Sequence, residues 1–345
     1  MTGSAVGPSA AVPSVPSAPH APAQKRDSLL SRILVTLAES RELTLFVLIV
    51  ILVVAMTVLY PNNFPTESNI SAILLNAAQN GILVTGMMLL FIAGFFDLSV
   101  GSILALSGVW AGVVVAQWGY PAPVGILVGC TVGILAGAFN GFLVTRVGIN
   151  ALITTLGTLA IFRGLTYVTA GTGVTPIGDE FKTYGQTDFL GLQSPFWVML
   201  AIVVVMAWAV SRTAFFRQYY FIGGNARAAQ LSGIRVARLT FTAFVLMGLL
   251  AGVAGVLGAA RLNSAVVSAG IGVELSVITA AVLGGASLRG GEGSIIGGVL
   301  GVLFIALVSN AMIINGIGVF WQPIVTGTVL LLAVSLDRFR RSRRA

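Results

Sequence analysis

Neutral polar side chains in the second apolar stretch are the residues whose types and spacing could do chemistry. Asn76, Gln79 and Asn80 stand at positions i, i+3 and i+4, so on a helix they share one face. Their amide groups both donate and accept hydrogen bonds, which suits a neutral, hydroxyl-rich solute. The spacing therefore indicates a translocation path past these side chains, near the axis of a dimer. Hydrogen bonding between helices is the equally supported alternative.

Other polar groups in the apolar stretches are few. Thr154, Thr155 and Thr158 share a helical face in the fifth stretch, where hydrogen bonding between helices is the favoured interpretation. Arg163 is the one charge well inside a predicted span, and it lies near the outer end. Proton- and sodium-coupled carriers place ionisable groups at mid-membrane. The absence of Asp and Glu there disfavours a secondary transporter.

Two acidic motifs resemble each other: FDLSV at 96–100 and VELSV at 273–277. An odd number of predicted spans separates them, so we expect the two turns on opposite sides of the membrane. That arrangement is typical of an inverted repeat of five plus five helices. For Asp97 and Glu274, capping of the helix that follows is favoured over contact with a substrate.

Catalytic and metal chemistry lack their usual residues. His20 is the single histidine and Cys130 the single cysteine, and no paired catalytic groups lie at membrane depth. We therefore expect no enzyme activity, no metal site and no bound cofactor. The phosphate-binding motif G-x-x-x-x-G-K-[ST] is absent, so ATP would have to be bound by a partner. The glycine-rich 284–294 stretch is predicted to be a tight turn between helices.

The stretch GGNARAAQLSGIRVAR at 223–238 interrupts the apolar pattern. We expect Gly223 and Gly224 to break the chain, Asn225 to cap a helix over 226–232, and Gly233 to end it. Such a helix is too short to be stable alone and too small-faced to anchor in lipid. Its small face, formed by Ala226, Ala229 and Gly233, is expected to enter a groove in a protein partner.

Composition identifies the elements that must position these residues. The chain has 345 residues, of which 57% are hydrophobic and 9% charged, and its mean hydropathy is +0.98. Soluble domains carry about a quarter charged residues, so the sequence predicts an all-α, polytopic membrane protein. The formal charge of +8 comes from arginines between apolar runs and at the C-terminus. These are topology signals and do not indicate nucleic-acid binding.

About ten transmembrane helices are predicted, since a span needs about 20 apolar residues. The tenth, 275–288, is short and glycine-rich, and it could be tilted, broken or re-entrant. The predicted spans are 43–60, 70–93, 100–118, 122–145, 149–168, 195–211, 239–259, 275–288, 294–310 and 319–336.

Charge asymmetry predicts the orientation and the domain boundaries. Residues 1–42 form a disordered tail and basic lead-in, 43–336 the transmembrane domain, and 337–345 a basic tail. Both termini and the arginine-rich 212–238 loop are expected in the cytoplasm, and the acidic 169–194 loop outside. Glycines recur every four residues at Gly125, Gly129, Gly133, Gly137 and Gly141, and we expect that helix to approach more than one neighbour closely.

Three motifs together resemble a known family. G-G-N-x-x-A-A-x-x-S-G-I at 223–234, F-D-L-S-V-G-S at 96–102 and E-L-x-x-I-x-A-x-V-L-G-G at 274–285, followed by G-G-x-G at 290–293, are similar to permease subunits of bacterial ABC importers for monosaccharides. This is the ribose, xylose, arabinose and galactoside branch of the branched-chain amino acid and sugar permease family. The resemblance spans roughly residues 43–336.

The resemblance implies a type II ABC importer-like fold in the bacterial inner membrane. It implies a homodimer, an ABC ATPase subunit that binds ATP and docks on the cytoplasmic side, and a periplasmic sugar-binding protein that selects the sugar. A stand-alone channel or facilitator for small neutral solutes is the alternative, but it has no use for the capped helix. The residues expected to couple to the ATPase are Gly224, Asn225, Arg227, Ala228, Ala229, Leu231, Ser232, Gly233 and Ile234.

Overall fold

The computed structural model describes residues 2–4, 7 and 41–342, and the chain divides into two units, Met1–Glu39 and Ser40–Ala345. The second unit is described here. Most of the predicted N-terminal tail and the last residues of the predicted C-terminal tail lie outside the described residues. The last helix continues beyond the predicted boundary at 336, to Ser342.

Helices form the described unit, and each predicted span contains one. Seven are long and apolar enough to cross a membrane, and the apolar stretches Val100–Ala116, Val273–Leu283 and Gln322–Ser335 are shorter. The chain is thus an all-helical polytopic membrane protein with seven candidate spans and these shorter apolar helices. The helices are α2 (Arg41–Leu59), α3 (Glu67–Ile92), α4 (Val100–Ala116), α5 (Ala122–Phe142, extended by η1, Leu143–Val147), α6 (Ala151–Ala170), α8 (Ser194–Arg212), α11 (Val236–Leu262), α12 (Val273–Leu283), α13 (Ile295–Ile314) and α14 (Gln322–Ser342).

Short elements lie in the connections. The connection between α6 and α8 holds α7 (Asp179–Gln186) and a two-stranded antiparallel pair, β1 (Asp188–Phe189) and β2 (Leu192–Gln193), in which Asp188 lies opposite Gln193. Helices α9 (Ala214–Gly224) and α10 (Ala226–Leu231) connect α8 to α11, and η2 (Val319–Trp321) precedes α14.

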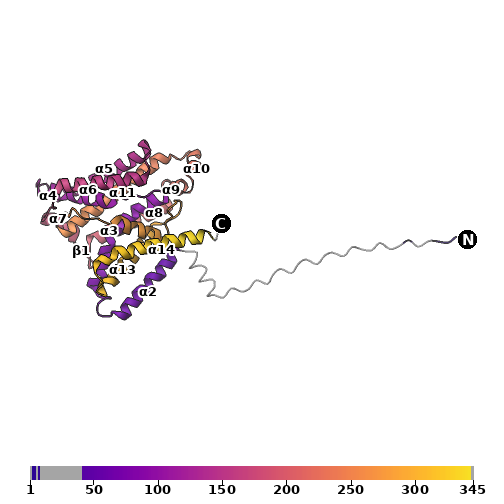
Figure 1. Ribbon diagram of the computed structural model, residues 1–345, viewed down its shortest axis with the longest axis horizontal. Helices are drawn as coiled ribbons and strands as arrows, with labels where there is room; N and C mark the ends of the chain where they lie inside the picture. The colour runs from indigo at the N-terminus through magenta and orange to yellow at the C-terminus, as the bar shows by residue number, and fades with distance from the viewer. Residues whose placement is uncertain (1, 5–6, 8–40, 343–345) are drawn as a thin grey trace. The chain divides into compact units, whose positions relative to one another are not determined.

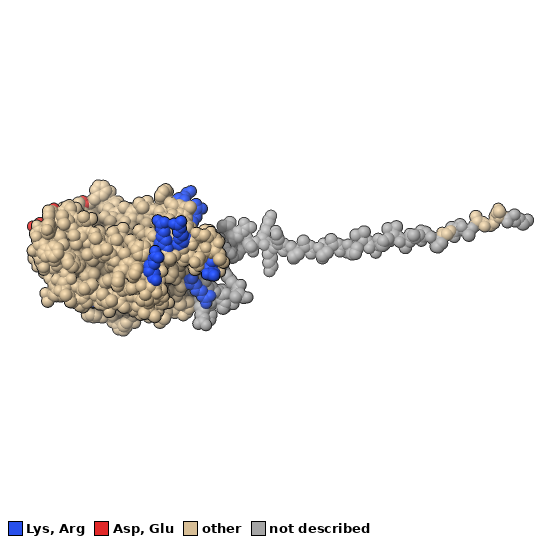
Figure 2. Space-filling view, turned by 90° about the horizontal axis from the view of Figure 1, so that it is seen from above, with Lys and Arg blue, Asp and Glu red and all other residues tan. Residues whose placement is uncertain are grey.

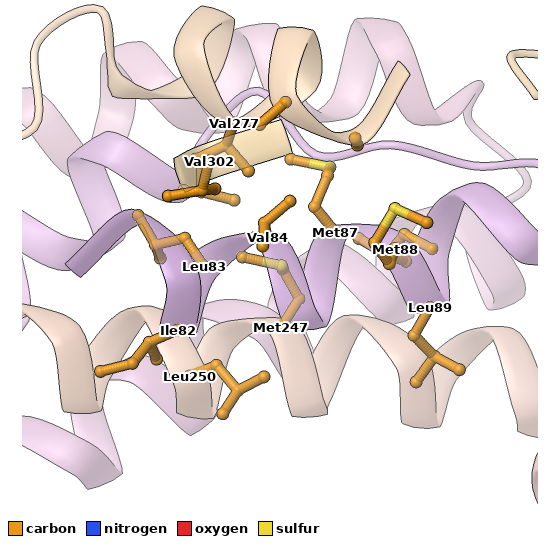
Figure 3. Packing of buried hydrophobic residues seen from close by; sticks show 14 of the residues in the cluster. Ile82, Leu83, Val84, Met87, Met88, Leu89, Met247, Leu250, Val277 and Val302 are labelled. Carbon is orange, nitrogen blue, oxygen red and sulfur yellow. The ribbon is translucent and has the colours of Figure 1, made fainter. Parts of the chain in front are cut away.

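Helix α3 is the centre of the bundle. It contacts α11 on one side and α12 and α13 on another, while α4 and α5 pack on α11 (Figure 1). Its second half, from Gly81 to Ile92, is buried throughout. Figure 3 shows Met247 and Leu250 of α11 on one side of α3 and Val277 and Val302 on the other. A helical segment that is apolar all round belongs inside a bundle, and the second half of α3 occupies that place.

The glycine spacing in α5 produces the expected close contacts with two neighbours. A Cβ added to Gly133 or Gly137 would overlap the backbone of α11, at Gly248 and Phe244 respectively. A Cβ on Gly125 would instead meet α4, 2.9 Å from the carbonyl oxygen of Ala111. The prediction that these glycines let α5 approach more than one neighbour is confirmed.

The predicted short segment at 275–288 contains α12, which has only 11 residues. The 263–272 segment before it is not helical and runs back into the bundle, where Gly270 packs against Gly101 in the first turn of α4. The turns of the two acidic motifs, expected on opposite sides of the membrane, therefore come close together. The sequence could not show this, because the path of a non-helical segment leaves no periodic pattern.

Candidate functional site

Helix α10 begins and ends as predicted from its caps. The Oδ1 atom of Asn225 accepts a hydrogen bond from the N–H of Ala228 at 3.0 Å. At the other end, Gly233 has φ +85° and the N–H of Ile234 donates to the carbonyl of Ala229 at 3.0 Å. Glycine accepts this left-handed conformation without steric cost, so Gly233 closes the helix. The helix ends one residue earlier than predicted, at Leu231.

The exposed surface of α10 differs from the one expected. The side chain of Leu231 is 77% exposed, whereas Ala229 is 4% exposed and packs into the core of its own chain. Ala229 therefore holds α10 in place and cannot share an exposed face with Ala226 and Gly233. Ile234 is half-buried. The exposed residues in and beside this helix are Gly224, Asn225, Ala226, Arg227, Ala228, Gln230, Leu231, Ser232 and Gly233.

The expected chain break at Gly223 and Gly224 is wrong. Both residues belong to α9, and the chain turns at Asn225. Gly223 instead permits a close contact, since an added Cβ would overlap the carbonyl oxygen of Ile92 and the backbone nitrogen of Gly291. Paired glycines commonly mark turns. Here the glycine at 223 instead allows close packing of the helix against other parts of the chain.

A junction of glycines connects α9 to two other parts of the chain. A Cβ on Gly290 would lie 2.8 Å from the Cα atoms of both Gly223 and Gly94. The N–H of Gly291 donates to the carbonyl of Ile92 at 2.9 Å. We call Gly94, Gly223, Gly290 and Gly291 the glycine junction. It joins α9 to the end of α3 and to the turn between α12 and α13, and that turn lies in the predicted 284–294 stretch.

Tyr220 strengthens the same contact, although no sequence pattern singles this residue out. Its hydroxyl donates to the carbonyl of Gly293 at 2.9 Å. Burial raises the pKa of this phenol, and the charge of Glu42 adds to the effect. The neutral donor form is therefore retained. Gly94 was also missed, although a glycine directly after a long apolar run is a signal for a helix end.

A cavity of about 730 Å³ opens beside α10. Arg227 and Gln230 of α10 line one wall, and Phe95 and Phe96 of the connection between α3 and α4 line another. Asn150, whose side chain caps α6, also lines the cavity. The cavity therefore lies next to α10, the helix that bears Leu231, and Arg227 contributes a positive charge to its lining.

Asp97 is fully buried and does not cap α4 as predicted, because Ser99 is the N-cap residue and no side chain caps that end. Its Oδ1 accepts hydrogen bonds from the N–H and the hydroxyl of Ser99 at 2.7 and 2.6 Å. Asn140 donates to its Oδ2 at 3.2 Å and to the Ser99 hydroxyl at 2.8 Å. Desolvation raises the pKa of the Asp97 carboxyl, although the hydrogen bonds from Ser99 and Asn140 oppose the shift.

Glu274 does not cap α12 as predicted. It lies within the first turn, after Gly272 as N-cap residue, and no side chain caps that end. Its carboxylate lies beside α4, since a Cβ on Gly101 would be 2.8 Å from Glu274 Oε2. A carboxylate in the first turn remains favourable for the helix dipole.

The three amide side chains of α3 make no hydrogen bond to any residue that the structure describes. Asn76 is exposed, and Gln79 and Asn80 are half-buried. Gln79 lines a cavity of about 50 Å³ with Ala105 and Gly258, and a Cβ on Gly258 would lie 3.6 Å from Gln79 Oε1. Within one chain, the alternative of hydrogen bonds between helices therefore has no support for these residues.

The threonine cluster on α6 also makes no hydrogen bonds between helices among the described residues. Thr155 and Thr158 donate to carbonyls of their own helix, at Leu152 and Thr155. The hydroxyl of Thr154 is buried without a partner. The favoured interpretation of this cluster is therefore wrong for the described residues, because a hydroxyl at helical spacing reaches its own preceding turn more easily than a neighbour.

Comparison with known proteins identifies relatives over most of the chain. The L-arabinose transport system permease protein AraH of Escherichia coli (strain K12) is 38% identical over 87% of this chain and 91% of its own length. The ribose import permease protein RbsC of Bacillus subtilis (strain 168) is 40% identical over 84% and 90%. The autoinducer 2 import system permease protein LsrC of Klebsiella pneumoniae subsp. pneumoniae is 35% identical over 88% of each. No solved structure matches the chain.

A family model decides the assignment. The model described as branched-chain amino acid transport system / permease component matches residues 69–334, which include both acidic motifs, α10 and the glycine junction. A permease component is a transport subunit and not a catalytic one. The chain belongs to this permease family.

Proposed function

We propose that the chain is the transmembrane permease subunit of an ATP-driven importer for a monosaccharide, a pentose or a hexose. Relatives named for L-arabinose and ribose support this substrate class. The unpaired amides of Asn76, Gln79 and Asn80 support it independently, because they offer hydrogen bonds to a neutral solute. A periplasmic sugar-binding protein delivers the sugar, and a separate ABC ATPase subunit binds and hydrolyses ATP.

The observation that carries the proposal is an exposed, capped α10 that directly follows α9, the helix that the glycine junction holds. Leu231 and Arg227 face outward, while Ala229 fixes the helix to the chain. A groove in the ATPase receives the exposed face. When the ATPase closes, α10 moves α9, and Gly223 transmits the displacement to the end of α3 and to the turn at Gly290. A facilitator has no use for such a segment.

The arrangement in the membrane follows from the same proposal. Ten helices span or enter the membrane as two inverted halves, and the transmembrane domain covers 43–336 between a tail at 1–42 and a basic tail at 337–345. Both termini and 212–238 lie in the bacterial cytoplasm, with the 169–194 loop in the periplasm. Two copies associate so that the exposed Asn76 and its neighbours face the path near the dimer axis.

Replacement of Leu231 by Glu tests the ATPase contact. A carboxylate in an apolar groove is an uncompensated charge, and burying one costs several kcal/mol. We expect Leu231→Glu to reduce co-purification of the ATPase subunit by about tenfold or more, a change that corresponds to about 1.4 kcal/mol. The permease should still insert, because Leu231 makes no core contact.

Leu190 provides a matched control, because its side chain is also 77% exposed and lies in the loop between β1 and β2. Leu190→Glu should leave co-purification of the ATPase at the wild-type level. Equal recovery of the ATPase with the Leu231→Glu and Leu190→Glu variants would exclude α10 as the docking element.

A further inference from the structure

The 263–272 segment enters the bundle from the end of α11. Leu104 of α4 lies against Gly255 of α11, and Gly101, one turn earlier in α4, lies against Gly270. At about 1.5 Å per residue, Gly270 is roughly 15 Å below the end of α11 at Leu262. Non-helical backbone at this depth is tolerated only where it is buried in protein or lines a polar cavity.

Other parts of the chain hold the start of this segment. Ala265 and Val174 exchange two backbone hydrogen bonds at 2.9 and 3.1 Å. The N–H groups of Ile177 and Gly178 donate to the carbonyl and the side chain of Asn263. These contacts fix the segment to the loop that precedes α7.

Arg163 of α6 holds the deeper part. Its Nη1 donates to the carbonyls of Val267 and Ala269 at 2.7 and 2.8 Å. The Arg163 side chain is half-buried. A charged residue in a membrane helix is costly unless it has such partners. Arg163 thus satisfies two carbonyls that have no helical partner.

The segment also closes the cavity beside Gln79. Its residues Ser264, Ala265, Val266 and Ala269 line this cavity together with Gln79 and Ala105. A volume of about 50 Å³ holds a few water molecules and not a monosaccharide. From the side of this cavity, a sugar can therefore reach the Gln79 amide only if the segment moves. Residues with positive φ at Asn263, Gly270 and Gly272 stand at both ends of the segment, where the backbone can change direction.

We propose that the 263–272 segment is the periplasmic gate of the translocation path and that Arg163 is the residue that positions it closed. The proposal rests on the proposed transport function and adds the location of the gate and the group that controls it. Binding of the sugar-loaded protein outside would displace the segment from Arg163 and open the cavity to the sugar.

Labelling of a buried cysteine tests the gate without requiring transport. In a Cys130→Ala background, Ala105→Cys places a thiol behind the segment, at a position that is 2% exposed. A hydrophilic maleimide is applied to the full permease in nanodiscs. Arg163→Met should raise the labelling rate by about tenfold, equivalent to about 1.4 kcal/mol in the opening equilibrium. Arg163→Lys should give an intermediate rate, since an ammonium lacks the planar fork of donors.

Two controls separate opening of the gate from other effects. Arg261→Met removes a nearby arginine that makes no side-chain hydrogen bond to the described residues, and it should leave labelling unchanged. Ala243→Cys, 0% exposed in α11, reports general unfolding and should stay unlabelled. If Arg163→Met exposes both reporters, that variant has unfolded. The labelling rate of Ala105→Cys in the Arg163→Lys variant then tests the gate.

Labelling of Ala105→Cys at the wild-type rate in either folded Arg163 variant would overturn the gate. Failure of the wild-type complex to import any monosaccharide would instead overturn the proposed function, and the labelling result would stand.

Discussion

At the scale of single residues, Asp97 is a buried acidic group that depends on its hydrogen-bond partners. It is fully buried, and its hydrogen bonds from Ser99 and Asn140 join the connection after α3 to α5. Burial disfavours its charged form, which is why the pKa of the carboxyl lies above its ordinary value. Removal of the side chain would leave the N–H and the hydroxyl of Ser99 without this acceptor, and the buried amide of Asn140 would keep only the Ser99 hydroxyl. The residue therefore matters for the position of α4.

Asp97→Ala should destabilise the permease by about 3 kcal/mol, because buried donors left unsatisfied cost about 1–3 kcal/mol each. The measurement is the thermal unfolding midpoint of the detergent-purified permease, which should fall by roughly 5 °C. An unchanged midpoint would show that the cluster contributes no stability.

The pH dependence of Asp97 has a defined sign. The raised pKa means that the folded state binds the proton more tightly than the unfolded state, so stability is lost as pH rises from the ordinary value of 3.8 through the raised pKa. Asp97→Asn does not titrate. The midpoint of wild type relative to that variant should therefore fall over this window, whereas parallel profiles would contradict the shift.

At the scale of elements, the glycine junction makes α9, the end of α3 and the turn after α12 a mechanical unit. The backbones of Gly223 and Gly290 are in direct contact. No side chain lies between them that could change its rotamer and absorb a displacement. A displacement of α9 must therefore move the other two segments. Close approach of small residues stabilises helix contacts in lipid, and in our proposal the same contacts also transmit motion.

Gly223→Ala should uncouple ATP hydrolysis from import. The added methyl group would overlap Ile92, so α9 must move away from α3, while the exposed face of α10 remains available to the ATPase. We expect normal co-purification of the ATPase and a fall of about fivefold in sugar imported per ATP hydrolysed in proteoliposomes, equivalent to about 1 kcal/mol. Gly157→Ala is the control, because a Cβ there meets nothing within 4 Å in another helix. The same transport ratio for both variants would contradict the role of the junction.

The sequence predicted the helices well and their contacts only partly. Apolar length is a local property, so each predicted span contains a helix, and the caps at Asn225 and Gly233 were identified from residue type. The inward course of 263–272 and the burial of Ala229 depend on neighbours distant in the chain. Arg163 was recognised as a rare charge, but its partners at Val267 and Ala269 could not be read from spacing.

At the scale of the whole unit Ser40–Ala345, arginines and acidic residues gather mainly at different ends. Figure 2 shows Lys and Arg gathered at one end and Asp and Glu at the other. The exposed arginines of the α8–α11 region include Arg212, Arg217 and Arg227, and the exposed acids of the opposite loop include Asp179 and Asp188. From the positive-inside rule we expect the arginine-rich end to lie in the cytoplasm.

Cysteine labelling in spheroplasts checks this orientation. In a Cys130→Ala background, an impermeant reagent added outside should label Thr183→Cys, which is exposed in α7. Ser232→Cys should react only after the membrane is permeabilised. The reverse pattern would invert the proposed topology.

The methionines around α3 have a consequence for motion. Met87 and Met88 of α3 and Met247 of α11 are completely buried where α3 meets its neighbours (Figure 3). A thioether side chain is unbranched and changes rotamer at little cost, so it can refill space as the surfaces around it shift. The contact between α5 and α11, made of glycine backbone, has no such freedom. We therefore expect shear within the bundle to be easiest along α3, the helix that carries Gln79, which we propose lines the sugar path.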